Sequence, residues 1–339
     1  HHLPEMSARQ LGNAVSTLFS SGSSAPPPDE LADGYLPPEI LEEFRKKLSH
    51  NSAQKYTSDI KSFVASYLNN NTEPVANKDN NDIDGESFRA ARMRITQSLH
   101  DDPHWQWPHT HQLLQLCVES HLADLCYDFA YHRLKVQDEK QYHDFDNLQF
   151  LTPELVGVDA AYVTRAWIGV AQNFASAIDR ARTPNDMLAA LLLLSSQLFQ
   201  GIRAADAARH DSSHAAAAAA DDFMPVLSFV VLKANPKKLA SALTIIAEWR
   251  DQDQLAGQQG YYYVSFCVAV SFLLNSCVKT SGLTEQQVVE LRQQAQHQHR
   301  WKSVIELTKA SKTINDDGNE DSDLGDEWVL LEHKLGDAH

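Results

Sequence analysis

Apolar residues recur at intervals of three and four positions in one segment of this chain after another, and this spacing constrains the fold more than any other feature. It places apolar side chains on one face of an α-helix, whereas a half-buried strand requires strict alternation, which no segment sustains. Glycine and proline are sparse, at 13 residues each among 339, which favours long helices over turn-rich sheets. The sequence therefore predicts an all-α fold. The clearest apolar face, within residues 56–68, comprises Tyr56, Ile60, Phe63, Val64, Tyr67 and Leu68.

The predicted helices fall into two groups. The first resembles an antiparallel helical bundle, and we expect it to pack on a layered, multi-helix second domain. The predicted helices are 36–48, 56–68, 86–100 and 113–134 in the first group, and 159–182, 187–202, 222–234, 238–249, 261–278 and 284–308 in the second. The predicted units are a disordered leader with a tag remnant over 1–35, the bundle over 36–140, the second domain over 141–282, a C-terminal helix over 283–312 and an acidic tail over 313–339.

Local residue choices mark some helix ends and leave others open. Thr183-Pro184-Asn185-Asp186 has the form of a helix start, with a threonine cap, proline at the first position and an acid at the third. Residues 204–220, which end in the alanine run 215–220, are of low complexity. They either extend a helix or form a loop, and the sequence does not decide between the two.

The charge balance excludes some kinds of partner. The formal net charge is −16, with 45 acidic against 29 basic residues, so the surface as a whole is unsuited to nucleic acid or to anionic membranes. Residues 261–278 are nearly uncharged, but they are of marginal length for a membrane span and carry several polar side chains. We expect a buried core helix there, and a cytoplasmic protein whose association with membranes is peripheral.

Cysteine and histidine spacing predicts no metal site. The cysteines form no C-x-x-C pair, and we expect them to be buried thiols in a reducing compartment. The histidine pairs His210/His214 and His297/His299 lack a carboxylate or cysteine set at ligand spacing. Phosphate-binding, dinucleotide, hydrolase and zinc-protease motifs are also absent from the sequence. The four cysteines are Cys117, Cys126, Cys267 and Cys277.

Three short blocks in the second half carry a family resemblance. They are Ala220-Asp221-Asp222-Phe223-Met224-Pro225, then Lys233-Ala234-Asn235-Pro236, and then Gly260-Tyr261-Tyr262. In this order and at these separations they resemble the core of the vacuolar-protein-sorting-nine (Vps-nine) domain of Rabex-like exchange factors. The resemblance continues more weakly over residues 146–277, and the predicted helices before it resemble the bundle that precedes this domain in such proteins.

Elementary helix chemistry explains part of the same pattern without any family. An acid at 221 or 222, just before an apolar helix, is expected to cap that helix, with Pro225 in its first turn. Asn235 and Pro236 are a structural motif that ends the helix, because the residue before proline avoids the α region. Tyr261 begins a run of helix-start aromatics with one face buried. Nothing in these patterns alone indicates a partner.

The resemblance implies a guanine nucleotide exchange factor for an early-endosomal Rab GTPase of the Rab-five class. It implies that Asp221 reaches into the nucleotide site of the GTPase, against its magnesium, phosphates and P-loop lysine. Tyr261 is implied to contact the switch region and Pro225 to shape the same groove. No cofactor of its own is implied, since GDP and magnesium belong to the GTPase, and the protein is implied to be recruited from the cytoplasm to endosomal membranes.

The chain departs from the family pattern at two positions of the implied groove. Val264 replaces the usual threonine three residues after the first tyrosine, and Ser265 takes a position often held by asparagine. The loss of the hydroxyl at 264 puts the polar contact there in doubt but not the hydrophobic one. Both residues are therefore candidates for setting the choice of Rab partner.

Two other interpretations remain open. The chain could be a non-catalytic helical scaffold that binds Rabs or other endosomal proteins; retention of Asp221, Pro225 and Tyr261 together favours the exchange factor. In the acidic tail, Trp328 and Leu331 stand three residues apart behind a run of acids. This resembles the short motif that docks on autophagy ubiquitin-like modifiers as an added strand, with a solvated tail or a capping helix as the alternative.

Overall fold

The structure is a computed structural model, and it describes residues 36–70, 83–208, 215–251, 255, 257–295 and 300–315. Within these ranges all regular structure is helical and no strand occurs, which confirms the predicted all-α fold. The predicted leader over 1–35 and the proposed docking residues Trp328 and Leu331 lie outside the described residues.

The N-terminal half is a helical bundle, as predicted. It contains α2 (Pro38–Leu48), the short η1 (Asn51–Ala53), α3 (Gln54–Asn70), α4 (Gly85–His100) and the first part of α5 (His111–Asp146). Helix α4 begins at Asp84, whose carboxylate accepts a hydrogen bond from Ser87 N at 3.0 Å. Trp105 is buried between Phe44 and Tyr56, with ring centroids 6.0 and 5.8 Å away, so the segment between α4 and α5 fills the bundle core.

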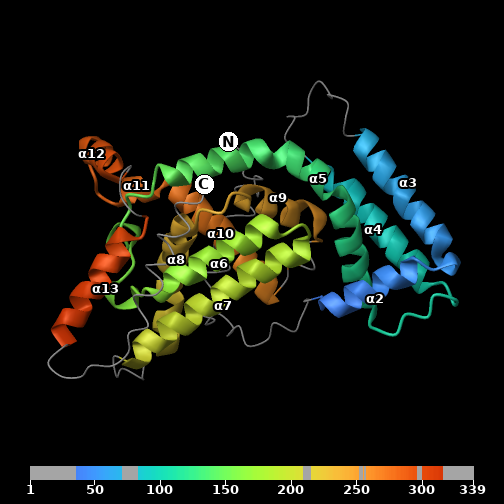
Figure 1. Cartoon of the computed structure of the whole chain (residues 1–339), viewed down its shortest axis with the longest axis horizontal. Coiled ribbons are helices and arrows are strands. Elements are labelled where there is room, and N and C mark those ends of the chain that lie inside the picture. Colours follow the sequence, from blue (N-terminus) through green and yellow to red (C-terminus); the bar gives the residue numbers. More distant parts are fainter. Residues whose placement is uncertain are drawn as a thin grey trace, which may run out of the picture.

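Helix α5 is 36 residues long and joins the two halves of the molecule. The predicted helix ended at residue 134, yet α5 continues to Asp146 through a stretch whose apolar residues are fewer but still buried, at Leu134 and Phe145. It contacts α2, α3 and α4 as well as α7, α9 and α10, and Figure 1 shows it running from the bundle across to the opposite end of the molecule. The predicted domain boundary at 140/141 therefore lies inside a continuous helix.

The second half packs around the long apolar helix α7 (Pro184–Ala208), which contacts α6, α8, α9 and α10. Its predicted cap is confirmed, since Asp186 N donates to Thr183 Oγ1 at 3.2 Å. By length and composition α7 could cross a membrane, but 61% of its most apolar window is buried in the protein. The other elements are η2 (Glu154–Val156), η3 (Ala160–Tyr162), α6 (Ala166–Arg180), α8 (Ala215–Ala234), α9 (Leu239–Trp249), α10 (Gly257–Asn275) and α11 (Cys277–Thr280).

The predicted single C-terminal helix is wrong, because the chain forms two. Helix α12 (Glu285–Ala295) and helix α13 (Lys302–Asn315) are separate, and a turn at 300–301 precedes α13. Trp301 is buried at this turn and meets the Phe229 ring edge-on at 6.1 Å. Burying this large aromatic against α8 fixes the turn.

A buried ionic network connects the bundle to the second half. Glu119 on α5 lies between Arg92 on α4 and Arg250 at the end of α9, with N–O distances of 3.1 and 3.0 Å. Arg92 also pairs with Asp251. The Glu119 side chain is 0% exposed and each arginine 1%, so these charges compensate one another away from water. This network holds α4, α5 and the end of α9 in a fixed relation.

Candidate functional site

The acid pair lies inside a helix, which corrects the prediction that it caps one. Helix α8 begins at Ala215, so Asp221 and Asp222 lie in its second turn and Pro225 is inside the helix instead of in its first turn. The alanine run explains the difference, because alanine has the highest helix propensity and carries the helix upstream of the acids. The backbone at Asp221 is helical, and its side chain lies outside the described part of the chain.

Pro225 weakens the turn that contains Asp221. Proline has no N–H, so it cannot donate the helical hydrogen bond to the carbonyl four residues earlier, which is that of Asp221. Pro225 and the neighbouring Met224 are only partly buried, whereas Phe223, at the adjacent position, is fully buried. The helical register puts backbone position 221 on the same face of α8 as positions 224 and 225.

Helix α10 presents Tyr261 and Val264 on its own partly buried side. Both residues pack against the core while remaining partly exposed, whereas Tyr262 is fully buried. A Cβ at Gly260 would overlap the backbone carbonyl of Leu255, so only glycine permits this close approach before the tyrosines. Burial raises the pKa of the Tyr261 hydroxyl, which therefore stays protonated at neutral pH.

Aromatic contacts bring the acid block and the tyrosine block to the same end of the α8–α10 pair. Phe223, two residues after Asp221, lies 6.0 Å from Tyr262 between ring centroids. Phe199 of α7 stacks on Phe223 at 4.3 Å and meets Tyr262 edge-on at 6.2 Å. Two sequence blocks almost forty residues apart are thus joined by a three-ring cluster.

The structure corrects the assignment of Ser265 to the partner-contacting surface. Ser265 is fully buried, and its hydroxyl donates to the carbonyl oxygen of Tyr261 at 2.9 Å. It therefore faces the interior and its hydrogen-bonding capacity is used within its own helix. Of the two departures from the family pattern, only Val264 reaches the partly exposed side of α10.

A group of residues that the sequence did not reveal lies beside the acid pair. The Tyr162 hydroxyl donates to Asp206 Oδ1 at 2.8 Å, and the Asp222 carboxylate is within hydrogen-bonding reach of the same hydroxyl. Burial, followed by these two acids, raises the pKa of Tyr162 above its ordinary value. Asp222 thus lies beside the Tyr162–Asp206 pair, and α7, α8 and η3 together form an acidic end. No sequence motif marks Tyr162 or Asp206.

The turn after α8 is a structural motif, as predicted. Helix α8 ends at Ala234, and Asn235 follows with a φ of 42° and donates from Nδ2 to Tyr142 O at 3.3 Å. An asparagine tolerates this left-handed conformation better than most residues. Two carboxylates from other helices then bind the start of α9: Asp179 accepts from Lys238 N at 3.1 Å, and Asp138 from Ser241 N at 2.8 Å.

Asp138 gives this region a pH dependence that can be measured. Its burial raises the pKa to about 6, above the value of about 3.9 in an unfolded chain. The folded protein therefore retains a proton that the unfolded chain has lost between about pH 4 and 6, so stability falls as pH rises through this range. As the pH rises from 4 to 7.5, we expect the free energy of unfolding of Asp138→Asn to increase by about 2 to 3 kcal/mol relative to that of the parent.

Urea unfolding of Asp138→Asn and the parent at several pH values measures this difference. Glu139→Gln, an exposed change at the next position of the same helix, is the matched control and should show no such drift. A difference between Asp138→Asn and the parent that stays constant with pH would contradict the assignment.

Among the described residues, no group of three or more histidine, cysteine or acidic side chains is arranged to hold a metal ion. The four cysteines are unpaired; Cys117, Cys126 and Cys277 are buried and Cys267 is partly buried. Burial raises the pKa of the Cys117 and Cys126 thiols to about 12, so they are inert as nucleophiles at neutral pH.

Comparison with known proteins identifies the class of domain that this geometry belongs to. Residues 168–277 match the family described as the vacuolar sorting protein 9 (VPS9) domain. This stretch contains α7, α8, α9 and α10 with both blocks of the candidate site. The chain therefore contains a VPS9 domain, as its resemblance to the Vps-nine family implied.

Individual relatives extend the similarity beyond that domain. Vacuolar protein sorting-associated protein 9A of Arabidopsis thaliana is 26% identical over 252 residues, covering 72% of this chain and 46% of that protein. The Rab5 GDP/GTP exchange factor of Mus musculus is 27% identical over 182 residues, covering 50% of this chain and 34% of that protein. The protein of the same name from Homo sapiens is 31% identical over 110 residues, covering 32% of this chain and 21% of that protein. The matched regions thus span less than half of these relatives.

Proposed function

We propose that this chain is a guanine nucleotide exchange factor that promotes GDP release from a Rab GTPase of the early-endosomal, Rab5 class. The observation that carries the proposal is the junction of Phe223 and Tyr262, which brings Asp221 of α8 and Tyr261 of α10 to the same end of the VPS9 domain. Two of the relatives are Rab5 GDP/GTP exchange factors, which supports a Rab GTPase as the partner.

The proposed chemistry is electrostatic. A bound GDP depends on magnesium and a lysine to neutralise its phosphates, and a carboxylate brought beside them competes for both cations. Asp221 is the candidate because it stands at the first acid of the family block, whereas Asp222 lies beside the Tyr162–Asp206 pair within the protein. Each 1.4 kcal/mol by which the carboxylate favours the release transition state raises the release rate about tenfold. No covalent bond changes, and both GDP and magnesium belong to the GTPase.

The docking surface in this proposal is the partly buried apolar side of the α8–α10 pair. Met224, Pro225, Tyr261 and Val264 are all partly buried, and Met224, Tyr261 and Val264 pack against the core. An apolar strip next to an acidic end suits a partner that offers a hydrophobic switch region beside a cationic nucleotide site.

Release of a fluorescent GDP analogue from a panel of purified Rabs tests the proposal. Acceleration with Rab5-class members and not with others supports both the activity and the class. Binding to a Rab without acceleration of release would favour the alternative, a non-catalytic Rab-binding scaffold. In cells we propose that the protein acts at early endosomes, to which it is recruited from the cytoplasm.

Val264 is proposed to influence which Rab is preferred. We expect Val264→Thr to change the ratio of exchange rates between Rab5-class and other Rabs by about threefold to tenfold, since one new hydrogen bond contributes about 1 kcal/mol. Exchange assays on the same panel measure this ratio. Ser265→Ala is the matched control, because its hydroxyl is buried and bonded within α10. Unchanged ratios for Val264→Thr would remove Val264 as a determinant.

A further inference from the structure

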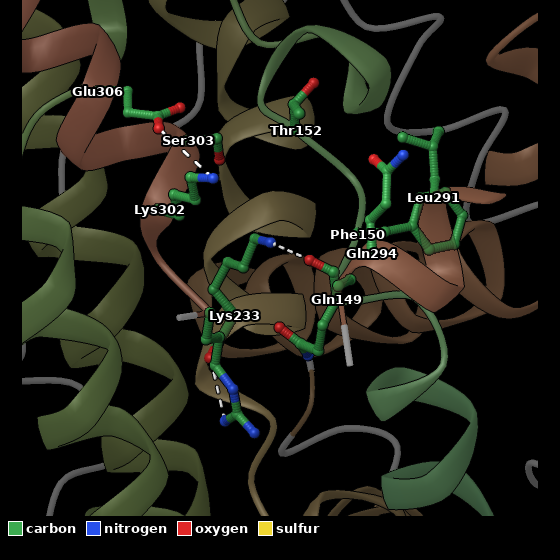
Figure 2. A pocket seen from close by; sticks show the side chains of 11 residues that line it. Gln149, Phe150, Thr152, Lys233, Leu291, Gln294, Lys302, Ser303 and Glu306 are labelled. Carbon is green, nitrogen blue, oxygen red and sulfur yellow. Dashed lines mark hydrogen bonds and ion pairs between the residues drawn. The ribbon is translucent and has the colours of Figure 1, made fainter. Parts of the chain in front are cut away.

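A basic cavity lies at the opposite end of α8 from the acid pair. Its volume is about 170 Å³, and it is enclosed by the end of α8, the segment 149–152, and helices α12 and α13 (Figure 2). Three cations line it, Lys233, Arg300 and Lys302, against one acid, Glu306. Lys233 lies twelve residues after Asp221, or about 18 Å along the helix, so this cavity is separate from the proposed GTPase site.

Lys233 is the unusual member of this group. Its side chain is 2% exposed, and its Nζ donates to the carbonyl oxygen of Gln149 at 2.6 Å and lies 5.4 Å from the Phe229 ring. Among the described residues, no carboxylate lies within ion-pair distance of it. A buried ammonium without a counter-charge is costly, and burial, with Arg300 as a second cause, lowers its pKa to about 7.

The other charges around the cavity leave it positive. Arg300 Nη2 lies 3.9 Å from Asp146 Oδ1, and Lys302 Nζ 3.8 Å from Glu306 Oε1. Both pairs are largely exposed and long, so they neutralise little. Arg292 of α12 stands over the ring of Phe150, which is one of the residues that line the cavity. The cavity is thus a local basic site in a chain whose net charge is −16.

We propose that this cavity binds one phosphate-type oxyanion, held by Lys233, Arg300 and Lys302. Charge-assisted hydrogen bonds from such cations are the strong contacts for phosphate oxygens, and the hydroxyls of Thr152 and Ser303 in the cavity wall add neutral donors. Pockets for drug-sized ligands measure about 300 to 1,000 Å³, so this cavity suits a single phosphate group instead of a whole nucleotide. Free phosphate and the phosphomonoester of a lipid headgroup share this chemistry.

Sulfate is the first probe because it keeps its double negative charge at neutral pH. The full chain is melted in sodium sulfate and in sodium chloride of equal ionic strength, and we expect a saturable rise in Tm of a few degrees in sulfate. Sulfate also stabilises proteins generally through exclusion from their surface. Variants at the cavity separate the two effects.

Lys233→Met is the decisive variant. We expect its Tm in chloride to be higher than that of the parent, because an unpaired buried charge is replaced by an apolar chain of similar length, and its specific sulfate response to be lost. Arg300→Gln should weaken sulfate binding about tenfold, whereas Lys279→Gln, an exposed change on α11, should leave it unchanged. Two results together would assign Lys233 a structural role and overturn the proposal. They are a Tm of Lys233→Met below that of the parent in chloride, and a parent protein that shows no sulfate-specific rise in Tm.

Two further experiments vary the pH and the chemical source of the anion. Sulfate affinity should fall about tenfold or more from pH 6 to 8.5, since the Lys233 ammonium must be charged to bind it; affinity independent of pH would overturn its role. Inorganic phosphate is then compared with vesicles that contain or lack a phosphomonoester lipid. Binding of phosphate alone indicates a soluble ligand, flotation with those vesicles and not with Lys233→Met indicates a headgroup, and binding of neither overturns the proposal. None of these measurements requires a GTPase.

Discussion

Asp221→Ala is expected to reduce the accelerated release of GDP to the intrinsic rate of the Rab, a loss of about a hundredfold or more. Removing a single preorganised charge or dipole at a site of electrostatic catalysis has effects of this size. We expect the fold to be unaffected, because position 221 lies within α8 and alanine favours the helix. Exchange kinetics and the thermal melt of the same preparation measure the two parts of this prediction.

Asp222→Asn provides the matched control for Asp221. Asp222 lies beside the Tyr162–Asp206 pair within the protein, so we expect its change to asparagine to alter stability modestly and to retain most of the exchange activity. If activity is lost with Asp222→Asn and retained with Asp221→Ala, the wrong carboxylate has been assigned. If both variants remain active, the electrostatic mechanism itself is wrong, and the apolar strip alone must account for exchange.

Glu119→Gln is expected to have the largest effect on stability, a loss of about 3 to 5 kcal/mol. Glu119 is the carboxylate that Arg92 and Arg250 share in the interior. Neutralising Glu119 removes the carboxylate charge that both buried guanidinium groups share. Arg92 then keeps its ion pair with Asp251, while Arg250 loses its ion pair with Glu119. Urea unfolding gives the free energy of unfolding, and the dependence on urea concentration should be unchanged if the folded state is otherwise preserved.

Asp128→Asn is the control for the ionic network. Asp128 pairs with Arg182 at 2.9 Å, but its side chain is 82% exposed, so we expect a loss below about 1 kcal/mol. Similar losses for the two variants would show that burial does not distinguish these ion pairs. The combined change of Arg92 and Arg250 to Met with Glu119→Leu should recover much of the stability, since apolar groups can replace a buried ion network.

The fold class and most helix positions follow from the apolar periodicity, and the errors have identifiable causes. Helix α5 runs past residue 134 because tertiary contacts with α9 stabilise a polar stretch that has few apolar residues of its own. Helix α8 starts early because of its alanines. The predicted last helix is divided into α12 and α13, and Trp301, at the turn before α13, is buried against Phe229 of α8. In each instance the helix boundary expected from the local sequence is shifted, either by the helix propensity of the residues before it or by packing against an element distant in sequence.

The candidate site was only partly accessible from sequence. The acid and tyrosine blocks could be found by their resemblance to a family, but helical register decides which residues face outward. Ser265 lies four residues after Tyr261, and its hydroxyl donates a hydrogen bond to the Tyr261 carbonyl oxygen. Tyr162 and Asp206 are 44 residues apart, and Arg92 and Asp251 are 159 apart. Such pairs depend on the assembled helices and have no local signature.

The continuity of α5 has a practical consequence for work on the isolated VPS9 segment. Residues 168–277 define the family match, yet α9 inside this stretch packs on α4 and α5, which both lie outside it. Almost every residue of α9 is buried. A fragment that begins at residue 168 would lack α4 and α5, and the apolar surface of α9 that they cover would be exposed to solvent. A fragment that carries the proposed exchange site should therefore retain the long helix α5 and the helices that flank it.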